Sequence, residues 1–181
     1  MKTHLTQRGV ASVSHAATVL AAFALSSFGS PLRAENLVTV SNISLELAQK
    51  AAAASLRQCQ TDGHRVSVTV TDAAGVTVLA ARADGAGPHT VESSRRKAYT
   101  AASLRQPTQV IAEIAAGSAE LAGLHDMNDS ILLLGGGFPI SLNGAIVGAI
   151  GVGGAPGVRL DETCARAGLA AIGAEPFGPP K

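Results

Sequence analysis

The clearest hydrophobic pattern of the chain lies between residues 131 and 152. Short apolar runs alternate there with glycines and with Asn143-Gly144, a dipeptide that favours the positive φ angles of a two-residue hairpin turn. Apolar residues occupy both sides of these runs, so we expect a sheet that is covered on both faces. The pattern predicts three strands, at residues 131–134, 139–142 and 145–152.

A second pair of strands is predicted nearer the N-terminus. In residues 65–71, valines alternate with serine and threonines, which is typical of a half-buried strand. A turn at 72–75 leads into the predicted partner strand at 76–82. In the last strand of the chain, Gly148 and Gly151 indicate that a helix, another subunit or a ligand approaches the backbone closely.

Helical spacing of apolar residues predicts four helices and one short turn. Ser44 suits the N-cap of the first helix and Thr90 that of the second, while Asp161 and Glu162 suit the first turn of the last. The predicted order α–β–β–α–α–β–β–β–α indicates an α+β domain of three layers, with five strands and helices on both faces. The helices are expected at residues 44–61, 91–104, 108–116 and 160–172, and the turn at 118–123.

The first 34 residues differ from the remainder. A basic start with Lys2 and Arg8 is followed by the apolar stretch 16–25 and by small residues up to Ala34, which is the order of a secretory signal peptide. We therefore expect cleavage after Ala34 and a periplasmic or secreted protein. The mature domain would span residues 35–175, and the proline-containing segment 176–181 would form a flexible tail.

Composition narrows the possible partners. Loss of three of the 14 basic residues with the leader would leave 11 against 13 acidic residues, a net charge of −2, which does not favour nucleic acid or an anionic membrane surface. No run of about 18 apolar residues predicts a membrane span. Hydrophobic residues make up 46% of the chain but aromatic residues only 3%. A core of small side chains leaves flat apolar surfaces, so we expect a homo-oligomer.

Three segments carry a resemblance to a known family: GAGPHTVESSRRKAYTAAS at 85–103, LLLGGGFPI at 132–140 and GAIVGAIGVGGAPG with LDETCARAGL at 144–169. They resemble the GlcG/HbpS-like haem-binding family, and the domain is also similar to the C-terminal domain of PduO-type proteins. The resemblance implies a profilin-like, five-stranded antiparallel sheet, homo-oligomers that are often octamers, and haem binding in some members. It implies no invariant catalytic triad, and members differ between haem storage, sensing and slow degradation.

The most polar patch is HTVESSRRKAYT at 89–100. Four of its side chains share one helix face, and two of them are cations that would suit an anionic ligand such as the haem propionates. His89 precedes them and is the candidate iron ligand. Because the resemblance does not fix the axial ligand, Tyr99 and Thr100 remain candidates, as does a solvated helix face without a ligand. The four residues of the shared face are Ser93, Arg96, Lys97 and Thr100.

One alternative for metal ligation and one question of covalent structure stay open. His125 and Met127 are a second candidate pair of haem ligands, whereas His64 is expected to be plain surface. Cys59 and Cys164 are either a disulfide or two buried thiols; the fold that the resemblance implies would place their helices side by side. Haem binding is the favoured function. An oligomeric binding or accessory protein for another small ligand, linked to oxidative metabolism, is the alternative. An enzyme is the weaker third hypothesis, because its catalysis would have to be supplied by a cofactor.

Overall fold

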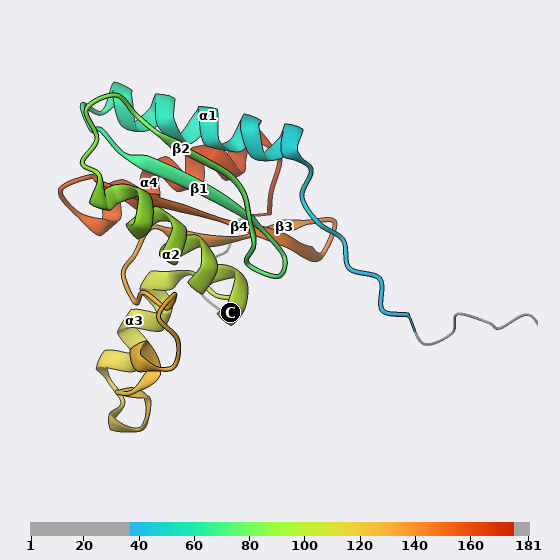
Figure 1. Cartoon of the computed structure of the whole chain (residues 1–181), viewed down its shortest axis with the longest axis vertical. Helices are drawn as coiled ribbons and strands as arrows, with labels where there is room; N and C mark the ends of the chain where they lie inside the picture. The colour runs from blue at the N-terminus through green and yellow to red at the C-terminus, as the bar shows by residue number, and fades with distance from the viewer. Residues whose placement is uncertain (1–36, 176–181) are drawn as a thin grey trace, which may run out of the picture. The chain divides into compact units, whose positions relative to one another are not determined.

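A computed structural model describes residues 37–175, in which four antiparallel strands form one sheet in the order β2-β1-β4-β3. Helices cover both faces of this sheet (Figure 1), so the predicted α+β architecture is confirmed. The predicted leader and tail lie outside the described residues. The elements are α1 (Leu45–Thr61), β1 (Ser67–Asp72), β2 (Thr77–Arg82), α2 (His89–Leu104), α3 (Thr108–Ala116), two 3₁₀ helices (Ala119–Leu121 and Leu124–Asp126), β3 (Gly137–Leu142), β4 (Ala145–Gly153) and α4 (Val158–Ala171).

The expected count of five strands is wrong for the described residues, because segment 131–134 is not a strand. Its backbone groups bond to side chains of helices instead of to another strand. The amide of Leu132 donates to Thr100 Oγ1 at 2.8 Å, and Thr108 Oγ1 donates to the carbonyl of Leu134 at 2.8 Å. Such side-chain partners satisfy the backbone as well as a ladder does. The apolar run is therefore a connection pinned to α2 and α3.

β1 is more buried than its alternating pattern predicts. The valines at 66, 68 and 70 face a large apolar cluster, but Ser67, Thr69 and Thr71 are also buried. β1 lies between β2 and β4 in the sheet, and α2 covers its hydroxyl face. The prediction of a half-buried strand is wrong because hydroxyl groups on α2 provide partners for this polar face.

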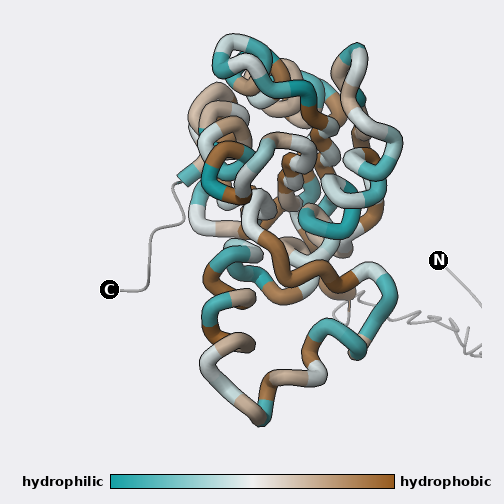
Figure 2. Tube along the Cα trace, turned by 90° about the vertical axis from the view of Figure 1, so that its left-hand side faces the viewer, coloured by the Kyte–Doolittle hydropathy of each residue, from teal (hydrophilic) through white to brown (hydrophobic). Residues whose placement is uncertain are grey.

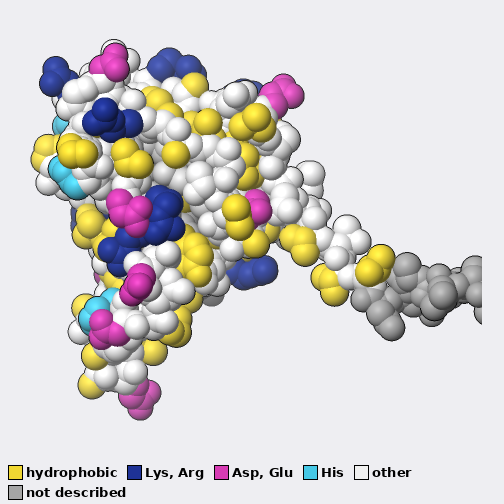
Figure 3. All heavy atoms as spheres, in the orientation of Figure 1, with side chains coloured by type: hydrophobic (Ala, Val, Ile, Leu, Met, Phe, Trp, Pro, Cys, Tyr) yellow, Lys and Arg dark blue, Asp and Glu magenta, His cyan; other side chains and the backbone are white. Residues whose placement is uncertain are grey.

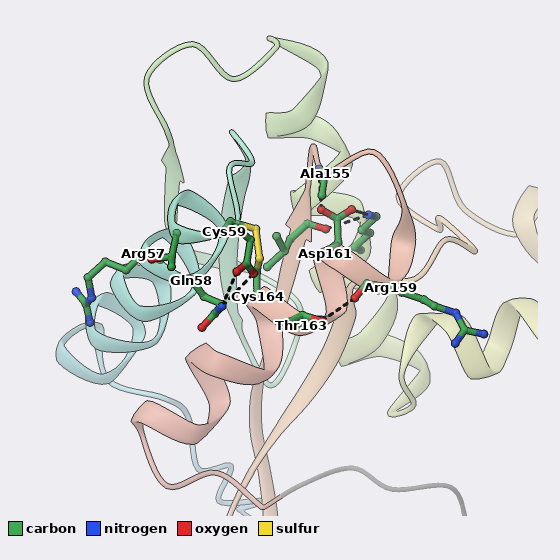
Figure 4. The surroundings of a disulfide bond; sticks show 12 residues. Arg57, Gln58, Cys59, Ala155, Arg159, Asp161, Thr163 and Cys164 are labelled. Atoms are coloured by element: carbon green, nitrogen blue, oxygen red, sulfur yellow. Dashed lines mark hydrogen bonds and ion pairs between the residues drawn. A yellow bond between two sulfur atoms is a disulfide. The ribbon is translucent and has the colours of Figure 1, made fainter.

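α1 and α4 form the layer on the opposite face of the sheet (Figure 1). Their contact is made by small residues: a Cβ added at Gly168 would clash with Ser55 Oγ and lie 2.7 Å from the carbonyl oxygen of Ala51. Cys59 and Cys164 are joined by a disulfide across this contact, with Cα atoms 5.4 Å apart (Figure 4). Of the two alternatives that the sequence left open, the structure contains the bond.

The segment from α3 to residue 130 projects from the sheet as an arm (Figures 1 and 2). The first 3₁₀ helix lies within the turn predicted at 118–123, and the second follows it directly. Apolar residues are spaced along the arm (Figure 2), and several are exposed. No helix within residues 37–175 is long and apolar enough to cross a membrane. The exposed apolar side chains of the arm are Ile114, Leu121 and Met127.

Candidate functional site

α2 carries most of the predicted site residues, and glycines of β4 fix its position. A Cβ added at Gly151 would lie 2.5 Å from the amide nitrogen of Ala98 and would clash with the carbonyl oxygen of Ser94. The group that approaches the backbone closely at Gly151 is therefore a helix of the same chain. At Gly153 an added Cβ would lie 2.8 Å from Ser93 Oγ. The half-buried Ser93 thus faces the end of β4.

Hydroxyl groups join α2 to β1. Ser67 Oγ lies 2.7 Å from Thr90 Oγ1, and Thr69 Oγ1 lies 2.8 Å from Ser94 Oγ. Thr90 also donates to the carbonyl of Gly87 at 2.7 Å. The helix begins at His89, so Thr90 lies inside its first turn and is not the N-cap that the sequence predicts. These bonds hold the start of α2 in a defined orientation on the sheet.

Lys97 is the most buried of the charged residues predicted to bind the ligand, with 1% of its surface exposed. Its ammonium group lies 2.7 Å from Asp161 Oδ2 and donates to the carbonyl of Val152 at 2.9 Å. Asp161 Oδ1 accepts from the amide of Ala155 at 3.0 Å. The sequence suggested a haem propionate as the partner of Lys97. In the structure, the partner of Lys97 is Asp161, at the start of α4.

The glycine run 135–137 accommodates this ion pair. Gly136 has a φ of +111°, and an added Cβ there would lie 3.1 Å from Lys97 Nζ and 2.9 Å from Asp161 Cβ. A side chain at this position would displace one of the two charged groups. The sequence pattern assigned Asp161 only to the helix dipole, and nothing in the polar segment around Lys97 indicated that this lysine has a buried partner in the last helix.

The side chains of Arg96 and Thr100 form hydrogen bonds with the connection that precedes β3. Thr100 Oγ1 accepts from the amide of Leu132, and Arg96 donates from Nη2 to the carbonyl of Ile131. Arg96 Nε is buried and has no hydrogen-bond partner among the described residues. The four residues of the predicted face therefore lie together on α2, but their polar groups point to different parts of the fold. The structure does not join them in one open site.

His89 and Tyr99 lie far apart on α2. His89 is exposed, and its ring lies against Gly87, where an added Cβ would be 2.6 Å from His89 Cε1. Tyr99 is half-buried and packs on the β1–β2 turn, with Cδ2 2.9 Å from a Cβ added at Gly75. At about 1.5 Å of rise per residue, the two side chains start about 15 Å apart along the helix axis. They cannot ligate one iron together.

The alternative ligands His125 and Met127 lie on the arm, away from α2. Both are exposed, and His125 Nε2 lies 3.3 Å from Asp126 Oδ1. Within residues 37–175, no group of three or more His, Cys, Asp and Glu side chains is arranged to hold a metal ion. Any haem iron at this position would therefore depend on these two side chains alone.

Two grooves meet at the end of the sheet near His89. They have volumes of ≈ 350 Å³ and ≈ 380 Å³, and His64 and Arg65 line both. Arg82 lines the first groove and Gly87 the second. The expectation that His64 is plain surface is wrong, because its side chain is half-buried between these grooves. No sequence motif marks them, since three separate connections contribute the lining.

Glu162 is a carboxylate in an unfavourable environment near the glycine run. Partial burial raises its pKa, and the nearby Glu113 acts in the same direction, while Arg166 and other cations oppose the shift. A Cβ added at Gly135 would lie 3.2 Å from Glu162 Oε1. Glu162 therefore lies on the same side of α4 as the buried ion pair but remains in contact with solvent.

The chain is similar in sequence and in structure to several known proteins. A family model described as haem degrading protein HbpS-like matches residues 43–170. A double mutant of Streptomyces reticuli HbpS is 43% identical with a TM-score of 0.71, covering 76% of this chain and 92% of that one. The protein ORFY from Klebsiella pneumoniae is 32% identical with a TM-score of 0.73, covering 78% and 97%.

The chain is also similar to a further solved structure and to a further sequence. The structure of a PduOC:heme complex is 25% identical with a TM-score of 0.69, covering 74% of this chain and 97% of that one. A Citrobacter freundii protein, an uncharacterized 15.0 kDa product of the dhaT-dhaS intergenic region, is 38% identical over 116 residues, which is 64% of this chain and 82% of that protein. The expected resemblance is confirmed: the chain belongs to the GlcG/HbpS-like family.

Proposed function

We propose that this protein binds haem and that His89 ligates the iron. The observation that carries the proposal is the family match over residues 43–170, together with a structural relative that was solved as a haem complex. His89 fits the role of ligand because it is exposed at the start of a helix, and its imidazole has no hydrogen bond to other residues in the described range 37–175. A neutral imidazole is a common haem ligand.

The remaining residues of α2 support this arrangement indirectly. The side chains of Lys97 and Thr100 are bonded within the fold, so in this proposal they hold α2 in place and do not touch the porphyrin. Storage, sensing and slow degradation of haem are all compatible with such a site. Any redox step would be supplied by the haem iron, and the protein would provide binding and orientation.

Titration of the purified protein with haem tests the proposal. We expect a shifted Soret band that saturates, and loss of the His-type spectrum in His89→Ala. The matched control is His125→Ala, which removes an exposed histidine from the arm and should leave the spectrum unchanged. No Soret shift in the wild type would contradict haem binding. If His125→Ala changes the spectrum and His89→Ala does not, the iron is ligated on the arm and not by His89.

We also propose that the protein is exported after cleavage near Ala34. The disulfide between Cys59 and Cys164 supports this, because such bonds persist in oxidising compartments outside the cytosol. Mass spectrometry of the protein from its native host should find an N-terminus near Glu35. A cytoplasmic protein that still begins near Met1 would contradict the proposal.

A homo-oligomer is the third part of the proposal. The arm exposes 54% of Ile114 and 63% of Met127. An exposed apolar surface of this kind is what self-association would bury. Another copy of the same chain is the partner that the low charge content and the family favour, and the resemblance implies an octamer as the assembly to look for.

A further inference from the structure

The loop between β2 and α2 places basic side chains beside His89. A Cβ added at Gly85 would lie 3.2 Å from Arg65 Nη1, so the guanidinium of Arg65 lies over this glycine. Two residues further along, the His89 ring lies over Gly87 in the same way. Two residues span at most about 7 Å of chain, so both side chains rest on one short stretch of loop.

Arg82 also contacts this loop. Its Nη1 donates to the carbonyl of Ala86 at 3.0 Å, and Ala86 lies between the two glycines. Arg65 and Arg82 both line the groove of ≈ 350 Å³. Asp84 is the acidic residue of this groove, but neither arginine forms an ion pair within the part of the chain that the structure describes.

The surroundings of these side chains leave room for a flat ligand. The adjoining groove of ≈ 380 Å³ is lined by backbone at Gly63, Gly85, Gly87 and Gly154. Gly85 and Gly154 have φ angles of +75° and +132°, which side-chain-bearing residues rarely adopt. Basic and histidine side chains gather at this end of the domain, on the left of Figure 3. The same end of Figure 1 shows the turn after α1 and the β2–α2 and β4–α4 connections side by side.

We propose that Arg65 and Arg82 bind the two propionate carboxylates of a haem whose iron is ligated by His89. Guanidinium groups form charge-assisted, often bidentate hydrogen bonds with carboxylates. The imidazole at the start of α2 supplies the iron ligand, and the glycine-lined groove admits the porphyrin edge. This assignment rests on the proposed haem binding and adds the residues that would recognise the anionic side of the ligand.

Haem and haem dimethyl ester, in which both carboxylates are masked, distinguish this site from non-specific binding. The proteins to compare are the wild type, Arg65→Gln, the double variant Arg65→Gln/Arg82→Gln, and the control Lys50→Gln, which removes an exposed cation from α1. We expect the double variant to bind haem on the order of 10- to 100-fold more weakly than the wild type. The control should equal the wild type.

The ester gives the second readout. The wild type should prefer haem over the ester, and the double variant should lose this preference while its circular dichroism spectrum stays unchanged. If the wild type binds haem but the double variant keeps both the affinity and the preference, the assignment of Arg65 and Arg82 is wrong and haem binding stands. If the wild type shows no Soret shift with haem, the proposed function itself fails.

Discussion

At the scale of single residues, the buried pair of Lys97 and Asp161 has the largest expected effect on stability. Both side chains are nearly inaccessible, and each has a second hydrogen bond, to the carbonyl of Val152 and the amide of Ala155 respectively. A buried pair of this kind contributes little compared with an apolar pair of the same size, but loss of one partner leaves an uncompensated charge.

Lys97→Ala should therefore lower the free energy of unfolding by about 3–5 kcal/mol. The double variant Lys97→Met/Asp161→Leu should recover part of this loss, because no charge then remains buried. Lys50→Ala, which truncates an exposed lysine, is the control and should change stability little. Urea denaturation measures all three. A loss below about 1 kcal/mol for Lys97→Ala would show that the pair is solvated.

Glu162 gives a prediction about pH. Burial raises the pKa of this carboxyl above its unfolded value, so the folded state binds the proton more tightly than the unfolded state does. Its contribution to stability is therefore lost as pH rises through these two pKa values. Glu162→Gln should be more stable than the wild type at neutral pH, and the difference should vanish in acid. Thermal melts from pH 4 to pH 7 measure this.

The control for Glu162 is Glu120→Gln, which changes an exposed carboxylate in the arm. This variant should show the same stability difference from the wild type at every pH in the series. A Glu162→Gln variant that is less stable than the wild type at neutral pH would instead indicate that Glu162 forms a favourable ion pair with Arg166 or another cation.

At the scale of elements, the disulfide joins the first and last helices of the domain. It closes a loop with a sequence separation of 105 residues, for which the chain-entropy model gives at most about 4.7 kcal/mol. Cys59→Ala/Cys164→Ala should lower stability by up to that amount. Reduction of the wild type should produce the same loss, measured by urea denaturation with and without reductant. Two free thiols per unfolded, non-reduced chain would contradict the bond.

Elements were predictable from the sequence where the pattern is local. The hydrophobic spacing and Ser44 located α1, and Asn143-Gly144 located the β3–β4 hairpin. The strand predicted at 131–134 failed because an apolar run does not reveal whether its backbone will meet another strand. Here, Thr100 and Thr108, both distant in sequence, provide the hydrogen bonds instead.

The candidate site was predictable only in part, for a similar reason. The segment 89–100 was identified by its polarity, but periodicity cannot tell an outward-facing cation from one that has a buried partner 64 residues away, as Lys97 has. The grooves beside His64 and Arg65 are lined by three separate connections. Their convergence depends on the tertiary fold, so no local pattern could mark them.

At the scale of the whole molecule, the exposed apolar arm predicts self-association. Ile114→Ser/Met127→Ser should shift the protein toward smaller species, because both side chains would lose favourable burial in an assembly. Val76→Ser, which replaces an exposed apolar side chain in the turn of the β1–β2 hairpin, is the control. Light scattering at micromolar concentration measures the mass. A wild type that is monomeric under these conditions would contradict self-association.

The central claim is that haem binds at the end of the sheet with its iron on His89. The position of the iron in crystals of the haem-loaded protein, taken from its anomalous scattering, tests this most directly. We predict an iron peak beside the His89 imidazole, at the end of the domain that carries Arg65 and Arg82. A peak beside His125 and Met127 on the arm, or no ordered iron near any histidine, would contradict the claim.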